Sequence, residues 1–407
     1  MNANEHHDDL EQLAQAAEAG NAKAQYALGL LLFSRGPEPE DRAQAVCWWK
    51  RAAAGGEREA EFMLGQCSQF GAALPQDLTQ AAAWYQRAAQ HGHPQARINL
   101  ASLLLSGTGV EKDEAQAFQW LRAAAEDDFV KAAAPLGRLY EDGIGTEADL
   151  GQAQRWYRRA AEKGICEAQY SLALLYLQGK GVERNEVQAV HWLTQAAGEG
   201  FMLAEFELGK CYLSGRGVAA DPLRSREWLE RAAAKGHPPA DYYLGLIYAQ
   251  GLGAAPDAEK FRDGMCRAAE AGLLEAQILL GSVLYEGSRL ERDLQQAVYW
   301  LQKAALQGAQ QAQFLLGQIY LHELQDYDAA LRWNQAAASQ HCAEAQYNLG
   351  YQCAHGLGTA PDRQQALAWF HRCYALTQND PRRAALAQNA SLAIQRLQES
   401  GLGADAT

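Results

Sequence analysis

The feature that most constrains the fold of this 407-residue chain is a pattern that restarts every 36 residues. Eight of the nine intervals between successive copies are 36 residues long, and the last is 33. A period of this length is typical of stacked supersecondary units, because each unit buries its apolar face against its neighbours. The ten copies begin at Ala24, Ala60, Ala96, Ala132, Ala168, Ala204, Ala240, Ala276, Ala312 and Ala345.

The first half of each copy predicts a helix, called helix A here. Leu stands four residues after the starting Ala in all ten copies, and Gly follows it in eight and Ala in two. A Gly inside a helix costs about 1 kcal/mol relative to Ala, so its recurrence predicts close approach to a second helix. The expected partner is a recurring small residue in the second half, such as Ala45 or Ala81.

The second half predicts another helix, helix B. It opens on Asp or Asn, and in seven copies Gln follows three residues later, which indicates an N-cap and a capping box. Trp lies seven residues after the cap in nine copies, and an Ala-Ala pair follows one helical turn later. The expected caps are Asp41, Asp77, Asp113, Asp149, Asn185, Asp221, Asp257, Asp293, Asp326 and Asp362.

A glycine–lysine–glycine stretch, Gly179-Lys180-Gly181, could be taken for a phosphate-binding loop. A P-loop follows a strand, occurs once and ends in Gly-Lys-Ser/Thr. Here the Gly-x-Gly element recurs in six copies, always between helix A and the cap of helix B. We therefore expect a chain reversal that needs residues tolerant of positive φ.

Composition and charge limit the kinds of partner and the compartment that we expect. The formal net charge of −13 argues against nucleic acid or an anionic membrane as the main partner. We find no signal peptide at the N-terminus and no apolar run long enough to span a bilayer. The eight cysteines form no CxxC and occupy unrelated repeat positions, which favours buried free thiols in the cytoplasm.

These repeats resemble the Sel1-like family, which is related to the tetratricopeptide repeat. The fifth copy matches the family pattern of Gly-x-Gly-Val, Ala, Trp, Ala-Ala and Gly, and the sixth adds Leu-Gly, Tyr and Asp. The matching residues are Gly179, Gly181, Val182, Ala189, Trp192, Ala196, Ala197, Gly200, Leu208, Gly209, Tyr212, Gly215, Gly217, Val218, Asp221 and Trp228.

The resemblance implies an all-α fold, a right-handed α-solenoid in which helix-turn-helix repeats stack into one superhelix. It divides the chain into an N-terminal tail and capping helix (1–21), ten repeats (22–380) and a C-terminal capping helix with a disordered tail (381–407). Similar proteins are scaffolds and adaptors in bacterial regulation, secretion or assembly, or immunity partners of toxins. Both roles, adaptor and tight-binding inhibitor, stay open from the sequence.

By analogy with tetratricopeptide proteins, helix A lines a concave groove that holds a partner protein or peptide. We expect the third, seventh and tenth residues of each copy to face this groove. The expected contact residues are Arg138, Tyr170, Leu174, Leu177, Phe206, Lys210, Leu213, Tyr242, Leu246, Phe314 and Tyr351. The alternative for the third-position residues is that they pack between successive A helices.

We expect no catalysis, cofactor or metal site, and a monomer in preference to an oligomer. The sequence holds no HExxH or GxSxG motif, and His6-His7-Asp8-Asp9 is expected to be a solvated tail rather than a metal site. Repeat 7 has Gly264 in place of the Trp, and we expect Phe261 to fill the space.

Overall fold

The computed structural model describes residues 3–36, 38–253 and 255–402. These residues form helices joined by turns, with no β-strand among them. The expected all-α solenoid of paired helices is confirmed, and its contacts divide the chain into two compact units. Unit 1 comprises Met1–Cys211 and Gly215–Ala219, and unit 2 comprises Tyr212–Ser214 and Ala220–Thr407.

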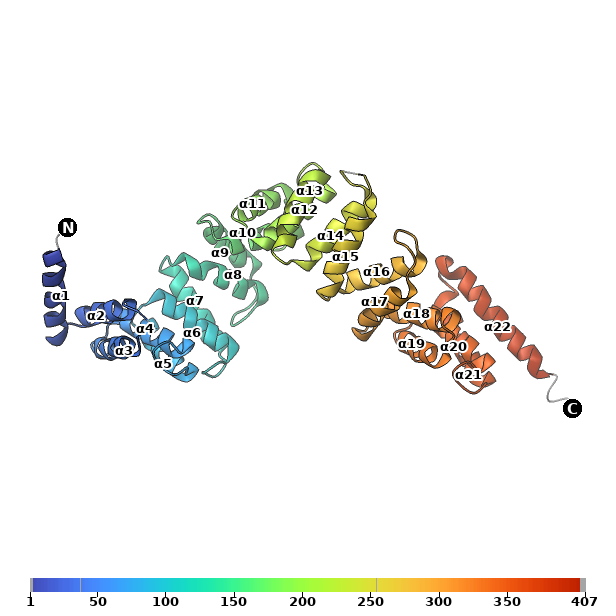
Figure 1. Ribbon diagram of the computed structural model, residues 1–407, viewed down its shortest axis with the longest axis horizontal. Helices are drawn as coiled ribbons and strands as arrows, with labels where there is room; N and C mark the ends of the chain where they lie inside the picture. The colour runs from blue at the N-terminus through green and yellow to red at the C-terminus, as the bar shows by residue number, and fades with distance from the viewer. Residues whose placement is uncertain (1–2, 37, 254, 403–407) are drawn as a thin grey trace. The chain divides into compact units, whose positions relative to one another are not determined.

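In unit 1 each helix from α1 to α10 packs against the next along the chain (Figure 1). The helices are α1 (Ala3–Glu18), α2 (Ala22–Ser34), α3 (Pro39–Ala54), α4 (Arg58–Phe70), α5 (Leu78–Gln90), α6 (Pro94–Ser106), α7 (Glu114–Glu126), the 3-10 helix η1 (Val130–Ala132), α8 (Ala133–Asp142), α9 (Leu150–Ala161), α10 (Cys166–Gln178), α11 (Glu186–Gly198) and α12 (Met202–Ser214), whose last three residues belong to unit 2.

Unit 2 repeats this arrangement from α13 to α22. Its elements are α13 (Pro222–Ala234), α14 (Pro238–Gln250), α15 (Ala258–Glu270), α16 (Leu274–Glu286), α17 (Leu294–Leu306), α18 (Gln310–Gln318), the π-helix η2 (Ile319–Glu323), α19 (Tyr327–Ser339), α20 (Ala343–His355), α21 (Arg363–Thr377), the 3-10 helix η3 (Pro381–Arg383) and α22 (Ala384–Leu402). Within the described ranges, none of the helices is both long and apolar enough to cross a bilayer.

Nine of the ten expected caps are confirmed. Asp77, for example, accepts a hydrogen bond from the Gln80 amide at 2.9 Å, and Asp149 accepts one from Gln152 at 2.9 Å. Asp41 is wrong, because α3 begins earlier, at Pro39, whose fixed φ suits the first turn of a helix. Pro37, two residues before Pro39, lies outside the described residues.

The capping box needs a correction. In the seven copies with Gln three residues after the cap, the backbone N–H of the cap was expected to meet that Gln side chain. Instead, the Asp77 N–H donates to the Ser68 carbonyl at 2.8 Å, and the Asp149 N–H donates to Tyr140 at 2.8 Å. Bonds of this kind tie the start of eight of the B helices to the helix A before them, so these caps also fix the two helices together.

The Gly-x-Gly turn between α6 and α7 shows why both glycines are needed. Gly107 ends α6 with φ +67°, and its N–H donates to the Leu103 carbonyl. Gly109, at φ +73°, lies against the Leu78 backbone in the first turn of α5, so a Cβ there would overlap it. The turn therefore reverses the chain, as expected, and also touches the preceding repeat.

The Gly of helix A lies against a large side chain of helix B, in addition to the backbone of the expected small residue. A Cβ on Gly65 would lie 2.6 Å from the Tyr85 ring, eight residues after the cap Asp77. Similarly, a Cβ on Gly29 would lie 2.5 Å from Trp49 Nε1 and 3.1 Å from the Ala45 carbonyl. The glycine therefore makes room for the main core side chain of helix B.

Repeat 7 shows the expected burial of Phe261, whereas both chain ends are more helical than expected. Phe261 is fully buried, as expected, and Gly264 lies against the α14 backbone, where a Cβ would be 2.8 Å from the Asp241 carbonyl. Helix α1 spans Ala3–Glu18, so the described part of the expected N-terminal tail is helical. Helix α22 packs against α21 and continues to Leu402, although the chain from Gly401 was expected to be disordered.

Candidate functional site

The third, seventh and tenth residues of each copy, which lie on helix A, form the surface that we call the A-helix face. Two third-position aromatic side chains, Phe62 and Tyr170, pack on the residue that precedes helix A of the next repeat. The Phe62 ring stacks on His93 with centroids 4.2 Å apart, and Tyr170 meets Phe201 at 5.6 Å. These side chains are half-buried. Much of the Phe62 ring and of the Tyr170 ring is therefore packed between successive repeats, as the alternative predicted.

Two expected contact residues are buried, which is a correction. Leu177 is 4% exposed and Phe206 is 8% exposed. The Arg216 guanidinium donates to the Leu177 carbonyl at 2.8 Å, and the Lys210 ammonium lies 4.9 Å from the centre of the Phe206 ring. Neither side chain offers enough surface to anchor a partner.

The other expected contact residues keep exposed surface. Arg138 and Tyr351 are exposed. Half-buried are Tyr170, Leu174, Lys210, Leu213, Tyr242, Leu246 and Phe314. Of the full set, Arg138, Tyr170, Leu174, Leu177, Phe206 and Lys210 belong to unit 1, and Leu213, Tyr242, Leu246, Phe314 and Tyr351 belong to unit 2.

Arg138 and Tyr170 come together at a cavity of about 400 Å³ in unit 1, between α8 and α10. The cavity exists because Ala134 holds the third position of repeat 4, where seven other repeats carry an aromatic residue. The sequence held this signal, one small residue in an aromatic column, but our prediction did not use it. The lining residues are Ala134, Pro135, Arg138, Tyr157, Glu167, Tyr170, Ser171 and Phe201.

The chemistry of this cavity suits an apolar or aromatic side chain. Its walls carry the rings of Tyr157, Tyr170 and Phe201. The Tyr157 hydroxyl donates to Glu141 Oε2 at 2.8 Å, and burial, with this carboxylate, raises the pKa of Tyr157 so that it stays neutral. Arg138 and Glu167, both exposed, place opposite charges on the lining. Aromatic anchors in such pockets carry much of the energy of protein interfaces.

A larger cavity, about 640 Å³, lies in unit 2 and contains none of the expected contact residues. Its lining includes Leu280, Leu284 and Trp300 from α16 and α17. Arg292, also in the lining, is 2.9 Å from the Glu323 carboxylate and donates to the Tyr285 carbonyl at 3.1 Å. This arginine already has partners within the chain, so we favour the smaller cavity as the candidate site.

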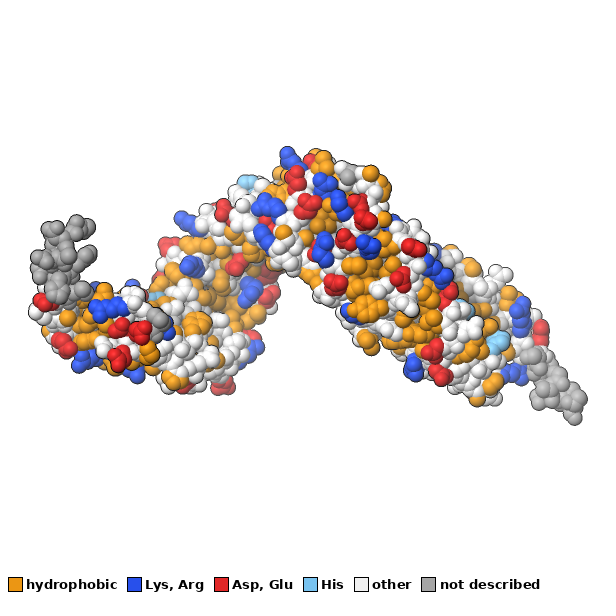
Figure 2. Space-filling view, in the orientation of Figure 1, with side chains coloured by type: hydrophobic (Ala, Val, Ile, Leu, Met, Phe, Trp, Pro, Cys, Tyr) orange, Lys and Arg blue, Asp and Glu red, His pale blue; other side chains and the backbone are white. Residues whose placement is uncertain are grey.

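Charge is mixed on the surface. On the face in Figure 2, hydrophobic, basic and acidic side chains are interspersed over both units. Among residues with described side chains, no group of three or more His, Cys, Asp and Glu is placed to hold a metal ion. The side chains of His6-His7-Asp8-Asp9 lie outside that set, so the expectation of a solvated tail there stays a prediction.

The cysteine thiols are placed irregularly in the structure, as they are in the sequence. Cys67, Cys211, Cys342, Cys353 and Cys373 are buried. Burial raises the pKa of Cys67, Cys211, Cys342 and Cys373 to about 11, so these thiols stay protonated at neutral pH. A protonated, buried thiol is a poor nucleophile.

A family model described as Sel1 repeat matches ten segments of the chain. The seventh match is short and ends before Gly264, where repeat 7 departs from the pattern. The matched residues are 22–57, 58–93, 94–129, 130–165, 166–201, 203–237, 238–260, 274–308, 310–342 and 343–376. No curated protein sequence matches the chain significantly.

Two solved structures are similar over most of their length. A protective antigen of uropathogenic Escherichia coli strains, described as displaying an SLR fold, is 32% identical, with 96% of this chain and 94% of that chain covered and a TM-score of 0.72. A Sel1 repeat protein from Oxalobacter formigenes is 32% identical, with 76% and 89% covered and a TM-score of 0.61.

An immunity protein from Pseudomonas aeruginosa is more distant. It is 20% identical, covers 53% of this chain and 88% of its own, and has a TM-score of 0.30. Similarity at this level does not bear on function.

Proposed function

Because this chain belongs to the Sel1 repeat family, we propose that it is a non-catalytic protein that binds a partner protein or peptide on the A-helix face of unit 1. Proteins of this family generally mediate protein–protein interactions. The two solved structures that are 32% identical to this chain come from bacteria. We propose that this chain is an adaptor in bacterial regulation, secretion or assembly. The irregular placement of the cysteines, five of them buried, supports the cytoplasm as its compartment.

The observation that carries this proposal is the cavity beside Ala134. It combines aromatic walls with charged groups of both signs, which suits one apolar or aromatic side chain of a partner and the polar backbone around it. Arg138 and Tyr170, both expected from the sequence, line it. The remaining exposed residues of the A-helix face of unit 1 extend the proposed contact surface along its helices.

The test fills the cavity. Ala134→Phe places a ring where other repeats already carry one, and Ala83→Phe adds the same ring to the exposed side of α5 as a matched control. Proteins captured by the wild-type chain are purified, and their dissociation constants are measured by calorimetry. We expect Ala134→Phe to weaken binding about tenfold or more and Ala83→Phe to leave it unchanged. Equal binding by the wild type and Ala134→Phe would refute the proposed site.

A further inference from the structure

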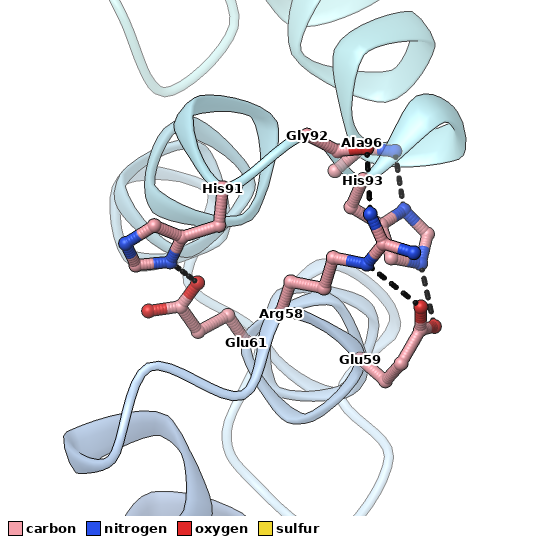
Figure 3. Close-up of polar contacts among 7 residues, drawn as sticks. All are labelled: Arg58, Glu59, Glu61, His91, Gly92, His93 and Ala96. Carbon is pink, nitrogen blue, oxygen red and sulfur yellow. Dashed lines mark hydrogen bonds and ion pairs between the residues drawn. The ribbon is translucent and has the colours of Figure 1, made fainter.

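A cluster of ionisable side chains joins α4 to the start of α6, away from the cavity (Figure 3). His93 precedes α6 and is its N-cap: its Nδ1 accepts a hydrogen bond from the Ala96 amide at 3.1 Å. Its Nε2 lies 2.9 Å from Glu59 Oε2 on α4. An atom that accepts from an amide carries a lone pair, so the proton of the neutral ring is on Nε2, from which it donates to Glu59.

The surroundings of His93 leave it little access to water. The side chain is about 8% exposed, and its ring is stacked on Phe62. Arg58 holds the other side of the junction: its Nη1 donates to the Gly92 carbonyl at 3.2 Å, and its Nε lies 3.3 Å from Glu59 Oε1. Glu59 is therefore shared between Arg58 and His93.

A second pair lies nearby. Glu61 on α4 is fully buried, and its Oε2 lies 2.7 Å from Nδ1 of the half-exposed His91. Arg87 on α5 lies 3.0 Å from Glu61 Oε1 and donates to the Ala53 carbonyl at 2.9 Å. The charged and titratable groups packed around this junction are Arg58, Glu59 and Glu61 from α4, Arg87 and His91 from α5 and its end, and Arg97 from α6, which is paired with Asp127.

We propose that His93 is a pH-sensitive clasp: neutral, it caps α6 and ties it to Glu59, and protonated, it releases the first turn of α6. Protonation puts a hydrogen on Nδ1, which then faces the Ala96 N–H, so two donors meet and the cap is lost. The ion pair with Glu59 would strengthen, but Arg58 already partly neutralises that carboxylate.

The balance of these effects favours the neutral ring. Burial lowers the pKa of His93 below its ordinary value and Arg58 lowers it further, while Glu59 raises it and compensates only in part. A histidine whose pKa is lower in the folded state stabilises the fold above its unfolded pKa of about 6.5. This contribution is lost as the pH falls from that value through the pKa of the folded state.

The chain supplies its own comparison for this role. Asn21 holds the same position before α2, and its Oδ1 accepts from the Ala24 amide at 3.1 Å. An asparagine does not titrate, so His93→Asn keeps the cap and removes the switch. His237 holds the same position before α14 without a side-chain cap, so a histidine in this place is not a cap by default.

Hydrogen exchange on the full-length chain at pH 7.5 and 5.0, corrected for the intrinsic pH dependence of exchange, tests the clasp. We expect protection of the Ala96 amide to fall about fivefold at pH 5.0 in the wild type, the value of one helix cap, and to stay constant in His93→Asn. The fall should persist in His91→Gln, which removes the other histidine and keeps His93.

Three outcomes would overturn the proposal. They are unchanged protection in the wild type, an equal loss in His93→Asn, or disappearance of the loss in His91→Gln, which would make His91 the sensor. Nuclear magnetic resonance titration of histidine-labelled wild-type protein gives an independent check. The His93 ring must titrate below pH 6.5. This clasp does not depend on the proposed partner, so each proposal can fail alone.

Discussion

Two junctions between repeats in unit 1 differ in the side chain at the third repeat position, and this difference decides whether the junction is packed or holds the candidate binding cavity. The junction of repeats 2 and 3 is α4–α6, and that of repeats 4 and 5 is α8–α10. Both tie the new helix A to the end of the preceding helix B: Arg97 Nε donates to the Ala89 carbonyl at 3.4 Å, and Gln169 Nε2 donates to Ala161 at 3.1 Å. At the third position, however, the first junction has Phe62 and the second has Ala134.

This difference changes the surface of the junction but leaves the helix pairs as they are. Phe62 is stacked on the capping His93, so the first junction is filled. Ala134 leaves the cavity that Tyr157 and Tyr170 line. A repeat array can therefore gain a candidate binding pocket when one side chain is shortened. The neighbouring helices keep their N-caps and the hydrogen bonds that join each helix A to the preceding helix B.

The largest expected effect comes from removing the Phe62 ring from the α4–α6 junction. Phe62→Ala should lower the free energy of unfolding of α4–α6 by about 2 kcal/mol, less than for a fully buried Phe because its ring is half-buried. Native-state hydrogen exchange of α4 and α6 measures this loss, and the reverse change, Ala134→Phe, should alter stability at α8–α10 by less than about 1 kcal/mol. Equal effects of the two changes would remove the contrast between the junctions.

A smaller effect is expected from removing the hydrogen bond that joins each new helix A to the end of the preceding helix B, which both junctions have. We call this hydrogen bond the clamp. Gln169→Ala removes the donor to the Ala161 carbonyl and to Gln195 Oε1, and should lower the stability of α9–α10 by about 1 to 2 kcal/mol, at about 1 kcal/mol for each hydrogen bond. Gln86→Ala, on the exposed side of α5, is the matched control and should cost close to nothing. Urea unfolding followed by hydrogen exchange compares them. A silent Gln169→Ala would show that the clamp is not what holds successive repeats together.

Sequence periodicity was enough to predict the helix pairs and most of their boundaries. Spacing identifies a helix cap because the cap acts on its own helix, and Asp77 and Asp149 behave as expected. Asp41 failed because the proline two residues before it starts the helix earlier.

Partners across helices were harder to predict. The sequence shows that Gly65 must clear space, but only the packing shows that the Tyr85 ring occupies it, with its burial raising the pKa of Tyr85 to about 12. The clamp at Gln169 was also missed, although a polar residue beside the starting Ala recurs in most copies. Periodicity gives the face of a helix, whereas contact with the preceding repeat depends on how far the helices are shifted along one another.

The candidate site was predicted only in part. Arg138 and Tyr170 were chosen because they face outward from helix A, and both line the cavity. Leu177 and Phe206 were chosen by the same rule and are buried; Arg216 bonds the Leu177 carbonyl, and Lys210 lies over the Phe206 ring. Long side chains reach across helical spacing in ways that position alone does not reveal.

Hydrogen exchange of the full-length chain, free and bound to a partner it captures, tests the central claim most directly. The account predicts added protection at α8 and α10, centred on Arg138 and Tyr170, and its loss with Ala134→Phe. Protection confined to α9 and α11, the B helices, with α8 and α10 unchanged, would contradict it.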